Sequence, residues 1–380
     1  MIWTFAESNG KNTDEVNLTA FKPTGKFYDD AAAVCKLLGV KVHPALRPVL
    51  WEKEKPVIFH DDEEEAKEAH EKDLATLKLD KHRLDKNSLK ALFYILPTST
   101  VRTLKFSNNG ITPSQFDNIS EHILQIPTIQ TLFFDWNPIY KEDYTKLDKN
   151  ADVYYKRSDT EPSRFAKFFS PESKLKIWFL RGNRLNDDDI KQICTSLKDN
   201  HFLKVIDISY NNITKSSILS FKELIDTNKT IEFIGLAKNN LTMEDLSPLL
   251  DVIGKQPFPE EEAEAHIKKM KERDTIIEKN KKLKASKKPE EVVPLIDDIE
   301  QLEDGSWVIV KNAQIRHINL WMNLIDDSSK DAVYDLLRRT PNEFSITLSG
   351  TQLSNESVEE IWSLLSNPSA PDLGKQRLLF

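Results

Sequence analysis

The sequence predicts an α/β solenoid with parallel strands on one face and helices on the other, and two observations carry this prediction. Eight segments follow one template of eleven residues, with apolar residues at positions 1, 4, 6 and 11 and Asn at position 9 in the clearest copies. The copies begin at 74, 101, 129, 175, 203, 231, 315 and 343, so that four of the seven steps are 28 residues long. A fixed period of this kind indicates stacked repeats, because each unit has an apolar face that it cannot bury alone.

Each copy is expected to form a short strand followed by an inward turn and a helix. The alternation in the fifth copy predicts that Ile206 and Ile208 point into the core and Asp207 points away from it. The template Asn follows at the turn, where its amide can donate to and accept from the backbone of the next coil. We therefore expect a structural ladder of buried asparagines: Asn109, Asn137, Asn183, Asn211, Asn239 and Asn323.

The copies 175-LKIWFLRGNRL-185, 203-LKVIDISYNNI-213 and 231-IEFIGLAKNNL-241 resemble leucine-rich repeats. The 28-residue unit with a helical second half resembles the ribonuclease-inhibitor-like subclass. This resemblance implies a horseshoe of about eight repeats with strands on its concave face and helices on its convex face. Repeats of that subclass commonly place Gly after the template Asn, whereas this chain has polar runs at 186–189 and 214–217. These short polar residues can act as helix N-caps.

Composition limits the classes of function. The formal charge of −8 and the pI near 5.6 argue against non-specific binding of nucleic acid through overall charge. Cys35 and Cys194 are too few for a disulfide framework, which favours a reducing compartment. The first residues lack the basic and apolar regions of a signal peptide, and no segment has the length of a membrane span. We expect a soluble, cytoplasmic protein.

The chain is expected to divide at its breaks in the repeat. Residues 1–73 do not fit the template and predict an N-terminal cap with an acidic linker, or alternatively a separate docking element. They include a helix over 28–38 that ends at Gly39. Repeats 1 to 6 occupy 74–258, with a polar insertion near 141–165. The final two repeats occupy 315–367, and the tail over 368–380 is expected to lie along a partner or to be disordered.

The segment 259–314 predicts a charged helical insertion. Acids lead the predicted helix over 260–286 and bases close it, which suits the helix macrodipole. The stripe of apolar residues along this predicted helix is too narrow for a buried helix, so we expect a projecting element. A solvated spacer, a basic arm that contacts an acidic partner and a calmodulin-like target helix all remain open. The candidate contact residues are Lys268, Lys269, Lys271, Arg273, Lys281 and Lys282.

The sequence lacks the motifs of common catalytic sites. It contains no Gly-rich phosphate loop, no HExxH, no CxxC and no G-x-S-x-G. We therefore expect no enzyme activity, cofactor, metal or small-molecule substrate. His60 or His70 in the acidic run matches no particular set of metal ligands. Arg181 or Arg184 beside Asn183 leaves open a small-GTPase activator, because some repeats of the subclass use an arginine and an asparagine from repeat loops.

The predicted concave face carries the strongest functional signal. Residues between and after the paired apolar positions of each copy should point to this face. Exposed aromatic residues with Arg are typical of binding hot spots. An alternative is that the insertion or the charged helix covers them. The candidate partner-binding residues are Phe133, Trp136, Phe179, Arg181 and Tyr210 over three consecutive repeats, with Trp321 further along.

These observations favour a non-catalytic protein-interaction scaffold. The late interruption by LLDVIGKQPFPEEEAEAHIKKMKERDTIIEKNKKLK, followed by a final pair of repeats, resembles leucine-rich repeat proteins of motile cilia, including those in central-pair projections. This resemblance implies a structural subunit of a cytoskeletal or axonemal assembly, with other proteins as partners and microtubules nearby, and with no contact to membrane or nucleic acid. The alternatives are a small-GTPase activator and an actin-capping protein.

Overall fold

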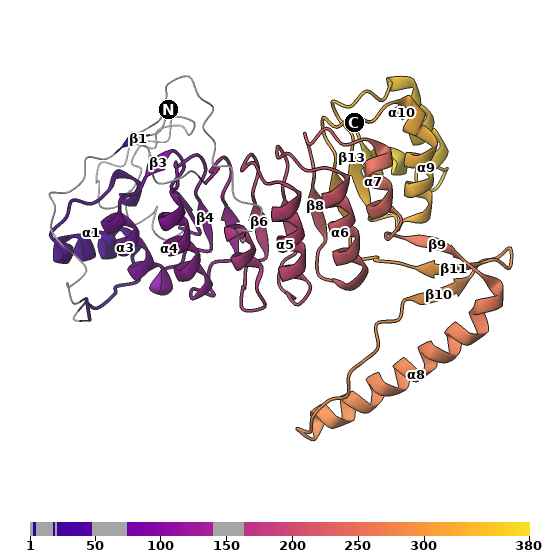
Figure 1. Cartoon of the computed structure of the whole chain (residues 1–380), viewed down its shortest axis with the longest axis horizontal. Coiled ribbons are helices and arrows are strands. Elements are labelled where there is room, and N and C mark those ends of the chain that lie inside the picture. Colours follow the sequence, from indigo (N-terminus) through magenta and orange to yellow (C-terminus); the bar gives the residue numbers. More distant parts are fainter. Residues whose placement is uncertain (1–2, 5–17, 20, 48–73, 140–162) are drawn as a thin grey trace. The chain divides into compact units, whose positions relative to one another are not determined.

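The computed structural model describes residues 3–4, 18–19, 21–47, 74–139 and 163–380 (Figure 1). The chain forms two compact units, of which the first comprises Met1–Leu185 with Phe202–Asn211. The second comprises Asn186–His201 with Asn212–Phe380. Most of the insertion predicted near 141–165 lies outside the described residues, as does the acidic run with His60 and His70.

The strands of the first unit come from the template copies. Adjacent strands are parallel and pair in template register, so that the fourth template residue of each copy aligns with that of the next. These aligned residues form one buried row: Leu77, Leu104, Leu132, Trp178 and Ile206. The strands are β2 (Thr76–Lys78), β4 (Thr103–Lys105), β5 (Thr131–Phe133), β6 (Ile177–Phe179) and β7 (Val205–Asp207).

Helices connect these strands as the spacing of apolar residues predicts. α3 (Lys86–Ile95) and η2 (Leu96–Thr98) follow β2, and α4 (Pro113–Leu124) follows β4. Thr112 begins α4 with a reciprocal capping box to Gln115. Before β6, the described residues include the short 3-10 helix η4 (Arg164–Phe169). Three of its residues are buried, and Phe168 and Phe169 pack on Trp178 at ring centroid distances of 4.6 and 4.4 Å.

The described part of the N-terminal segment packs on the first repeat. The predicted helix is present as α1 (Phe27–Leu38), which contacts α3 and ends at Gly39 with φ of 66°. The Asp30 carboxylate accepts hydrogen bonds from the backbone N–H groups of Thr24 and Gly25. The described residues of this segment also form η1 (Pro44–Leu46) and β1 (Trp3–Thr4), which pairs with β3 (His82–Arg83).

The second unit continues the same pattern of strands and helices. β8 (Phe233–Gly235), β12 (His317–Asn319) and β13 (Ser345–Thr347) pair in parallel and in register. The strand order of the whole sheet is β14-β13-β12-β8-β7-β6-β5-β4-β2, which is the α/β repeat solenoid that the sequence predicted. The helices are α5 (Asp187–Leu197), α6 (Lys215–Thr227), α7 (Met243–Leu250), η5 (Asp327–Ser329), α9 (Lys330–Arg339) and α10 (Asn355–Leu365).

The polar residues after the template Asn start the helices, as expected. Asn186 caps α5 and forms a capping box with Asp189, and Thr214 caps α6. The Asp187 carboxylate also accepts from the Thr214 backbone N–H at 2.9 Å, one repeat further along. A carboxylate in the first turn of one helix therefore supports the start of the next.

The long insertion adds an arm without adding a repeat. Although 84 residues separate their template copies, β8 pairs directly with β12, and Ile234 aligns with Ile318. The predicted helix over 260–286 is α8 (Glu260–Ala285), which projects away from the repeat helices of its own unit (Figure 1). We name α8 and the segment 286–297 that follows it the arm.

The sequence did not predict the small antiparallel sheet at the base of the arm. β9 (Lys255–Phe258), β11 (Trp307–Val310) and β10 (Asp298–Gln301) pair in the order β10-β11-β9. Pro257 argues against a strand in the sequence, but β9 lies at the edge of the sheet, where a missing N–H is tolerated. The insertion therefore begins at β9, before the predicted boundary at 259.

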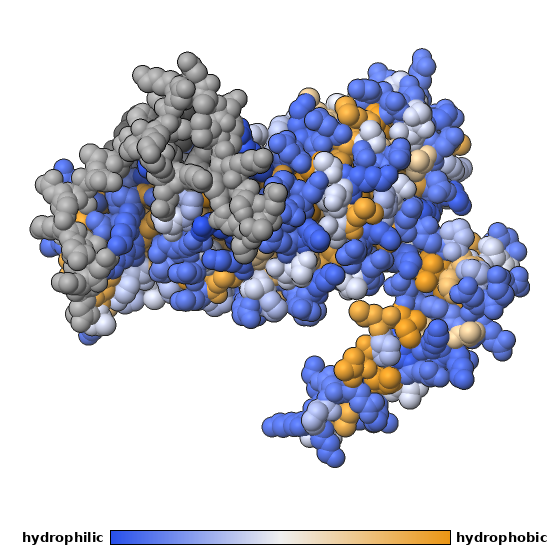
Figure 2. Space-filling model, viewed as in Figure 1, coloured by the Kyte–Doolittle hydropathy of each residue, from blue (hydrophilic) through white to orange (hydrophobic). Residues whose placement is uncertain are grey.

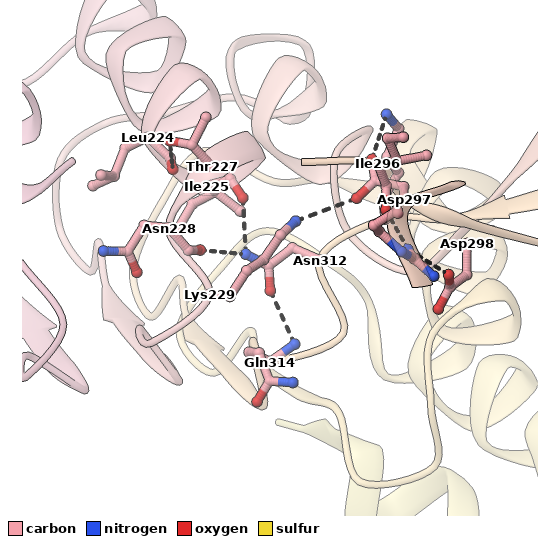
Figure 3. A network of polar contacts seen from close by, with 12 residues as sticks. Leu224, Ile225, Thr227, Asn228, Lys229, Ile296, Asp297, Asp298, Asn312 and Gln314 are labelled. Atoms are coloured by element: carbon pink, nitrogen blue, oxygen red, sulfur yellow. Dashed lines mark hydrogen bonds and ion pairs between the residues drawn. The ribbon is translucent and has the colours of Figure 1, made fainter. Parts of the chain in front are cut away.

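The base of the arm is fixed to the repeats by buried polar contacts (Figure 3). Asn312 is buried, and its Nδ2 donates to the carbonyl oxygens of Ile225 and Asn228, each at 2.8 Å. Asn228 in turn donates to the carbonyls of Leu197 and Asn200. The Asp297 carboxylate lies between the Lys229 and Lys311 ammonium groups, at 3.4 and 3.1 Å. These contacts hold the arm at a defined place on the second unit.

The C-terminal tail closes the sheet. The sequence predicted contact with a partner or disorder for 368–380, but α11 (Leu373–Arg377) and β14 (Leu378–Leu379) form here, and β14 pairs with β13. Arg377 is buried and donates to the carbonyls of Phe344 and Thr340. The tail therefore covers the edge that the last repeat would leave open.

The template asparagines are buried and bond to the backbone of neighbouring copies. Asn211 Nδ2 donates to the carbonyls of Leu180 and Ile208, and its Oδ1 accepts from the Leu185 N–H at 3.0 Å. The Asn137 N–H donates to Asn183 Oδ1 at 2.8 Å, and the Asn239 N–H donates to Asn323 Oδ1 at 3.1 Å. One side chain thus satisfies backbone groups of two copies.

We expect Asn211→Leu to lower the free energy of unfolding. Leu has a similar volume but no polar group, so at least two buried backbone groups lose partners at about 1–3 kcal/mol each. The urea midpoint measures this loss. Asn212→Leu is the matched control, because it makes the same substitution one residue away, at an exposed position. An Asn211→Leu midpoint equal to that of the control would contradict the structural role of the ladder.

Candidate functional site

The centre of the candidate site is a pair of stacked phenylalanines on neighbouring strands of the first unit. Phe133 ends β5 and Phe179 ends β6, and the two residues are direct partners in the parallel register. Adjacent strands are separated by about 4.8 Å, which brings equivalent side chains into contact. The two rings are 4.4 Å apart with an interplanar angle of 9°. Both are half-buried, so part of each ring remains on the surface.

Two cations flank the stacked rings. Lys105 Nζ lies 4.6 Å from the centroid of the Phe133 ring, and Arg181 Cζ lies 5.3 Å from that of Phe179. A cation near the face of an aromatic ring is attracted by the ring quadrupole. The order Lys105, Phe133, Phe179, Arg181 therefore forms one row across three neighbouring strands and the turn that follows β6. We name these four residues the aromatic row.

A buried carboxylate holds Arg181 in place. Asp135 Oδ2 accepts from Arg181 Nη2 at 2.6 Å and from Nε at 3.0 Å, and Oδ1 accepts from the Arg181 backbone N–H at 2.9 Å. Partial burial acts to lower the pKa of Arg181, but the hydrogen bonds and charge of Asp135 outweigh it, so the pKa is raised. The guanidinium is permanently charged and fixed in direction.

A second carboxylate, Asp207, ends β7 and is the register partner of Phe179. The alternation along the strand predicts that Asp207 points away from the core, yet only 4% of the residue is exposed. Its Oδ1 accepts from the Ser209 N–H at 2.9 Å. Burial raises the pKa of Asp207, although the Ser209 hydrogen bonds and the charge of Arg181 oppose that shift. The site therefore holds an acid that is unfavourable to ionise beside a fixed cation.

An unusual backbone conformation sets the other aromatic pair. The eighth template residue has a positive φ in every copy: Lys81, Asn108, Trp136, Gly182, Tyr210, Lys238, Met322 and Gly350. This left-handed region suits Gly and Asn, and a bulky residue there is an outlier. Trp136 and Tyr210 adopt it with φ of 55° and 58°. The repeat turn imposes this conformation, and these two copies place a large aromatic side chain there.

Gly182 allows these two aromatic residues to meet. It occupies the eighth position between them, and a Cβ there would lie 2.2 Å from the Trp136 ring. The indole therefore extends over Gly182 and reaches Tyr210, at a centroid distance of 5.3 Å. Trp136 remains 48% exposed. The structure thus brings Phe133, Trp136, Phe179, Arg181 and Tyr210 together within the first unit.

Trp321 lies in the second unit, in surroundings of its own. Its backbone N–H donates to Asn319 Oδ1 at 3.0 Å, and its indole Nε1 would lie 3.4 Å from a Cβ at Gly350. On the neighbouring strands, His317 stacks on Phe233 at 5.0 Å and contacts Ser345 and Thr347. Burial lowers the pKa of His317, which favours the neutral imidazole.

The predicted basic residues of α8 separate into two groups. Lys268, Lys269, Lys271 and Lys282 are exposed, and Lys281 is exposed beside Glu278. Arg273 has a different role from the predicted one, because its Nη1 donates to the Ile296 carbonyl at 2.7 Å and to Asp298 at 2.8 Å. The hydrogen bonds to the carboxylates of Asp274 and Asp298 raise the pKa of Arg273. Arg273 therefore holds the arm together.

Three members of the site were missed by sequence reasoning. Lys105, Asp135 and Asp207 occupy template positions that were expected to face the concave surface, but only aromatic residues and Arg were selected there. Asp135 follows Phe133 by two residues, and its spacing to Arg181 matches the step between their template copies. That shared position is a signal for a contact between neighbouring repeats.

Both cysteines lie in the described residues and are buried. Burial raises the pKa of Cys35 to about 11 and raises that of Cys194 further, so both thiols stay protonated. Within the described ranges, no group of three or more His, Cys, Asp or Glu residues is placed to hold a metal ion. None of the helices in those ranges combines the length and apolarity needed to cross a bilayer.

No protein-family model matches the chain, and no curated protein is similar to it. Among solved structures, TLR13 from a complex with ssRNA13 is 11% identical with a TM-score of 0.26, over 71% of this chain and 32% of that one. The chain thus spans about a third of the length of TLR13. An internalin (inlF) from Listeria monocytogenes is 12% identical with a TM-score of 0.26, over 87% of this chain and 90% of that one. The assignment of an α/β repeat solenoid rests on the chain's own template and strand order.

We expect Gly182→Ala to destabilise the protein through two separable effects. A left-handed Ala costs roughly 1–2 kcal/mol, and the clash with the Trp136 ring adds to it. In the Trp136→Ala background the clash is absent, so the same change should cost less. Urea unfolding of the four proteins of this cycle measures the difference. Equal losses in both backgrounds would show that the indole does not lie over Gly182.

We expect Asp207→Asn to stabilise the protein at pH 7. The amide oxygen can still accept from Ser209, and a buried negative charge is removed. Because burial raises the folded-state pKa above 3.8, the wild type gains stability as the pH falls through its folded-state pKa. The advantage of the variant should therefore shrink below that pKa. Urea midpoints against pH test this, with the exposed Asp199→Asn as control. Lower stability at pH 7 would mean that attraction to Arg181 outweighs burial.

Proposed function

We propose that the chain is a non-catalytic protein-interaction scaffold and that the aromatic row with Trp136 and Tyr210 is its main partner surface. The observation that carries this proposal is the preorganised stack of Phe133 and Phe179 between Lys105 and Arg181. Such rings lose little side-chain entropy on binding, since each is already held by its neighbours. A fixed cation beside partly exposed aromatic surface is typical of the residues that dominate protein interfaces.

The exposure of Trp136 supports a binding role. Its left-handed φ is shared by the eighth residue of every copy, but a Trp that is 48% exposed is not explained by burial in the core. The indole offers apolar area and a hydrogen-bond donor to a partner. The indole can lie over Gly182 because that residue has no side chain.

The exposed lysines of α8 form a second contact in this proposal. Lys268, Lys269 and Lys271 lie near the middle of the helix, and Lys282 lies near its end. A stiff helix with a basic face suits an acidic protein surface, and such contacts weaken as salt rises.

We further propose that the scaffold is a structural subunit of a cytoskeletal assembly, in particular of the ciliary central apparatus. The resemblance of its interrupted repeats to proteins of the motile-cilium axoneme supports this assignment. The pairing of a strand with a helix in each 28-residue unit also supports the ribonuclease-inhibitor-like subclass. The acidic surface of microtubules is a partner that the lysines of α8 fit.

The geometry gives less support to a small-GTPase activator. An arginine that stabilises a transferring phosphoryl group needs its guanidinium available to the phosphate. Arg181 instead donates twice to Asp135, at 2.6 and 3.0 Å. No described feature favours actin capping over a general scaffold.

Detergent extraction of cells that express the tagged full chain tests the proposal. We expect the protein to remain in the cytoskeletal pellet, because its partners are structural, and to be released as salt rises. Phe179→Ser should reduce retention by removing the stacked ring. Charge reversal at Lys268, Lys269 and Lys271 should lower the salt needed for release and weaken co-sedimentation with purified microtubules.

Phe202→Ser is the matched control, because Phe202 is 37% exposed and lies outside the aromatic row. Each variant is first shown to keep the wild-type urea midpoint within the error of the measurement. Complete release by detergent alone would overturn the cytoskeletal assignment. Retention that Phe179→Ser leaves unchanged would overturn the proposed role of the aromatic row.

A further inference from the structure

The arm exposes aliphatic side chains that the rest of the chain does not cover. Val292 is 91% exposed, Leu295 is 76% exposed and Val293 is 37% exposed. Figure 2 shows apolar surface running along this part of the molecule. On α8 itself, Ile276 and Leu283 are half-exposed and lie seven residues apart, on one face of the helix. We name these five residues the arm patch.

The arm patch is held in shape by a regular set of hydrogen bonds. His266, Arg273 and Asn280 are each seven residues apart on α8, so they share one face. His266 Nε2 contacts the Asp297 carbonyl at 2.8 Å, and Arg273 Nη1 donates to that of Ile296. Asn280 both donates to the Glu291 carbonyl and accepts from the Glu291 N–H, each at 2.8 Å. The segment that carries Val292 and Leu295 is therefore preformed, so little entropy is lost when a partner covers it.

The charges around the arm patch are divided between the two ends of α8. Glu260, Glu261, Glu262 and Glu264 lie in its first two turns, whereas six lysines occur between 279 and 288. Favourable interaction with the helix macrodipole extends over the first and last turn only, so it does not account for all six lysines. Glu291 forms an ion pair with one of them, Lys279. The arm is thus acidic at one end and basic, with exposed aliphatic residues, at the other.

We propose that the arm patch is a self-association surface and that its occupant is the arm of a second copy of this chain, packed antiparallel about a two-fold axis. With the axis near residue 273, the acidic first turns of each helix lie opposite the lysines of the other. The two-fold axis repeats each contact between an acid and a lysine, so a modest contact counts twice.

Charge complementarity selects this arrangement over the alternatives. A parallel pair of arms would place acids against acids and lysines against lysines, which is repulsive. An acidic partner protein would neutralise the lysines but would repel Glu260–Glu264. A helix of 26 residues is roughly 39 Å long, so the two charged ends are far enough apart to act separately. This surface shares the lysines of α8 with the contact proposed above for an acidic partner, but sedimentation of the purified chain tests self-association with no such partner present, so the two proposals can fail separately.

Sedimentation velocity of the full chain, in low and high salt, tests the proposal. We expect a wild-type dimer in low salt that weakens in high salt. The first charge variant changes Glu260, Glu261, Glu262 and Glu264 to Lys. The second changes Lys281, Lys282, Lys284 and Lys287 to Glu. Each variant alone should be monomeric, because both ends of its α8 then carry charge of the same sign.

An equimolar mixture of the two charge variants should dimerise again, because each basic end now meets an acidic one. The rescue also shows that both variants are folded, which circular dichroism checks independently. Leu295→Asp should weaken the wild-type dimer at least tenfold, or about 1.4 kcal/mol, whereas Leu364→Asp on α10, where Leu364 is 54% exposed, should not. A monomeric wild type in low salt, or a dimer that none of these changes affects, would overturn the proposal.

Discussion

The structure depends on the hydrogen bonds between each template Asn and the backbone of its neighbours. Asn211 reaches carbonyl oxygens of its own copy and of the previous one, and accepts an N–H from the previous turn. Without that side chain, the inward turn after each strand would leave buried donors and acceptors unpaired. The eighth template residue is left-handed in all eight copies, including the two in which His82 and Thr351 follow it in place of Asn. The ladder therefore fixes the stacking, and the left-handed residue sets the direction in which the chain leaves each strand.

This constraint also builds the candidate site. Parallel register places equivalent residues of neighbouring copies side by side, so a residue type repeated at one template position becomes a row. Phe133 and Phe179 stack for that reason, and Asp135 meets Arg181 for the same reason. At the left-handed position, Gly182 leaves a gap that Trp136 fills. Local sequence differences between copies are thereby converted into a specific surface.

The sequence predicted the repeats well, because the 28-residue step recurs and nearly all apolar residues of the template are buried. It also identified Phe133, Trp136, Phe179, Arg181 and Tyr210 as one cluster. It missed the contacts that bind residues from different copies, such as Asp135 with Arg181. It missed a second set of buried asparagines as well, although Asn200, Asn228 and Asn312 each precede a template copy by three residues. Strands of two to four residues, such as β14 and β9, leave too short a pattern to recognise.

That second set of asparagines explains how the chain accepts an arm without losing its register. Asn312 follows the whole insertion, yet it donates to the carbonyls of Ile225 and Asn228 as Asn228 does to those of Leu197 and Asn200. The backbone thus returns to the repeat through the same buried contact that ends an ordinary helix. Because the exit and the return are both fixed, the 84-residue step needs no extra strand between β8 and β12. The arm can therefore carry charge and apolar surface that the repeats themselves could not accommodate.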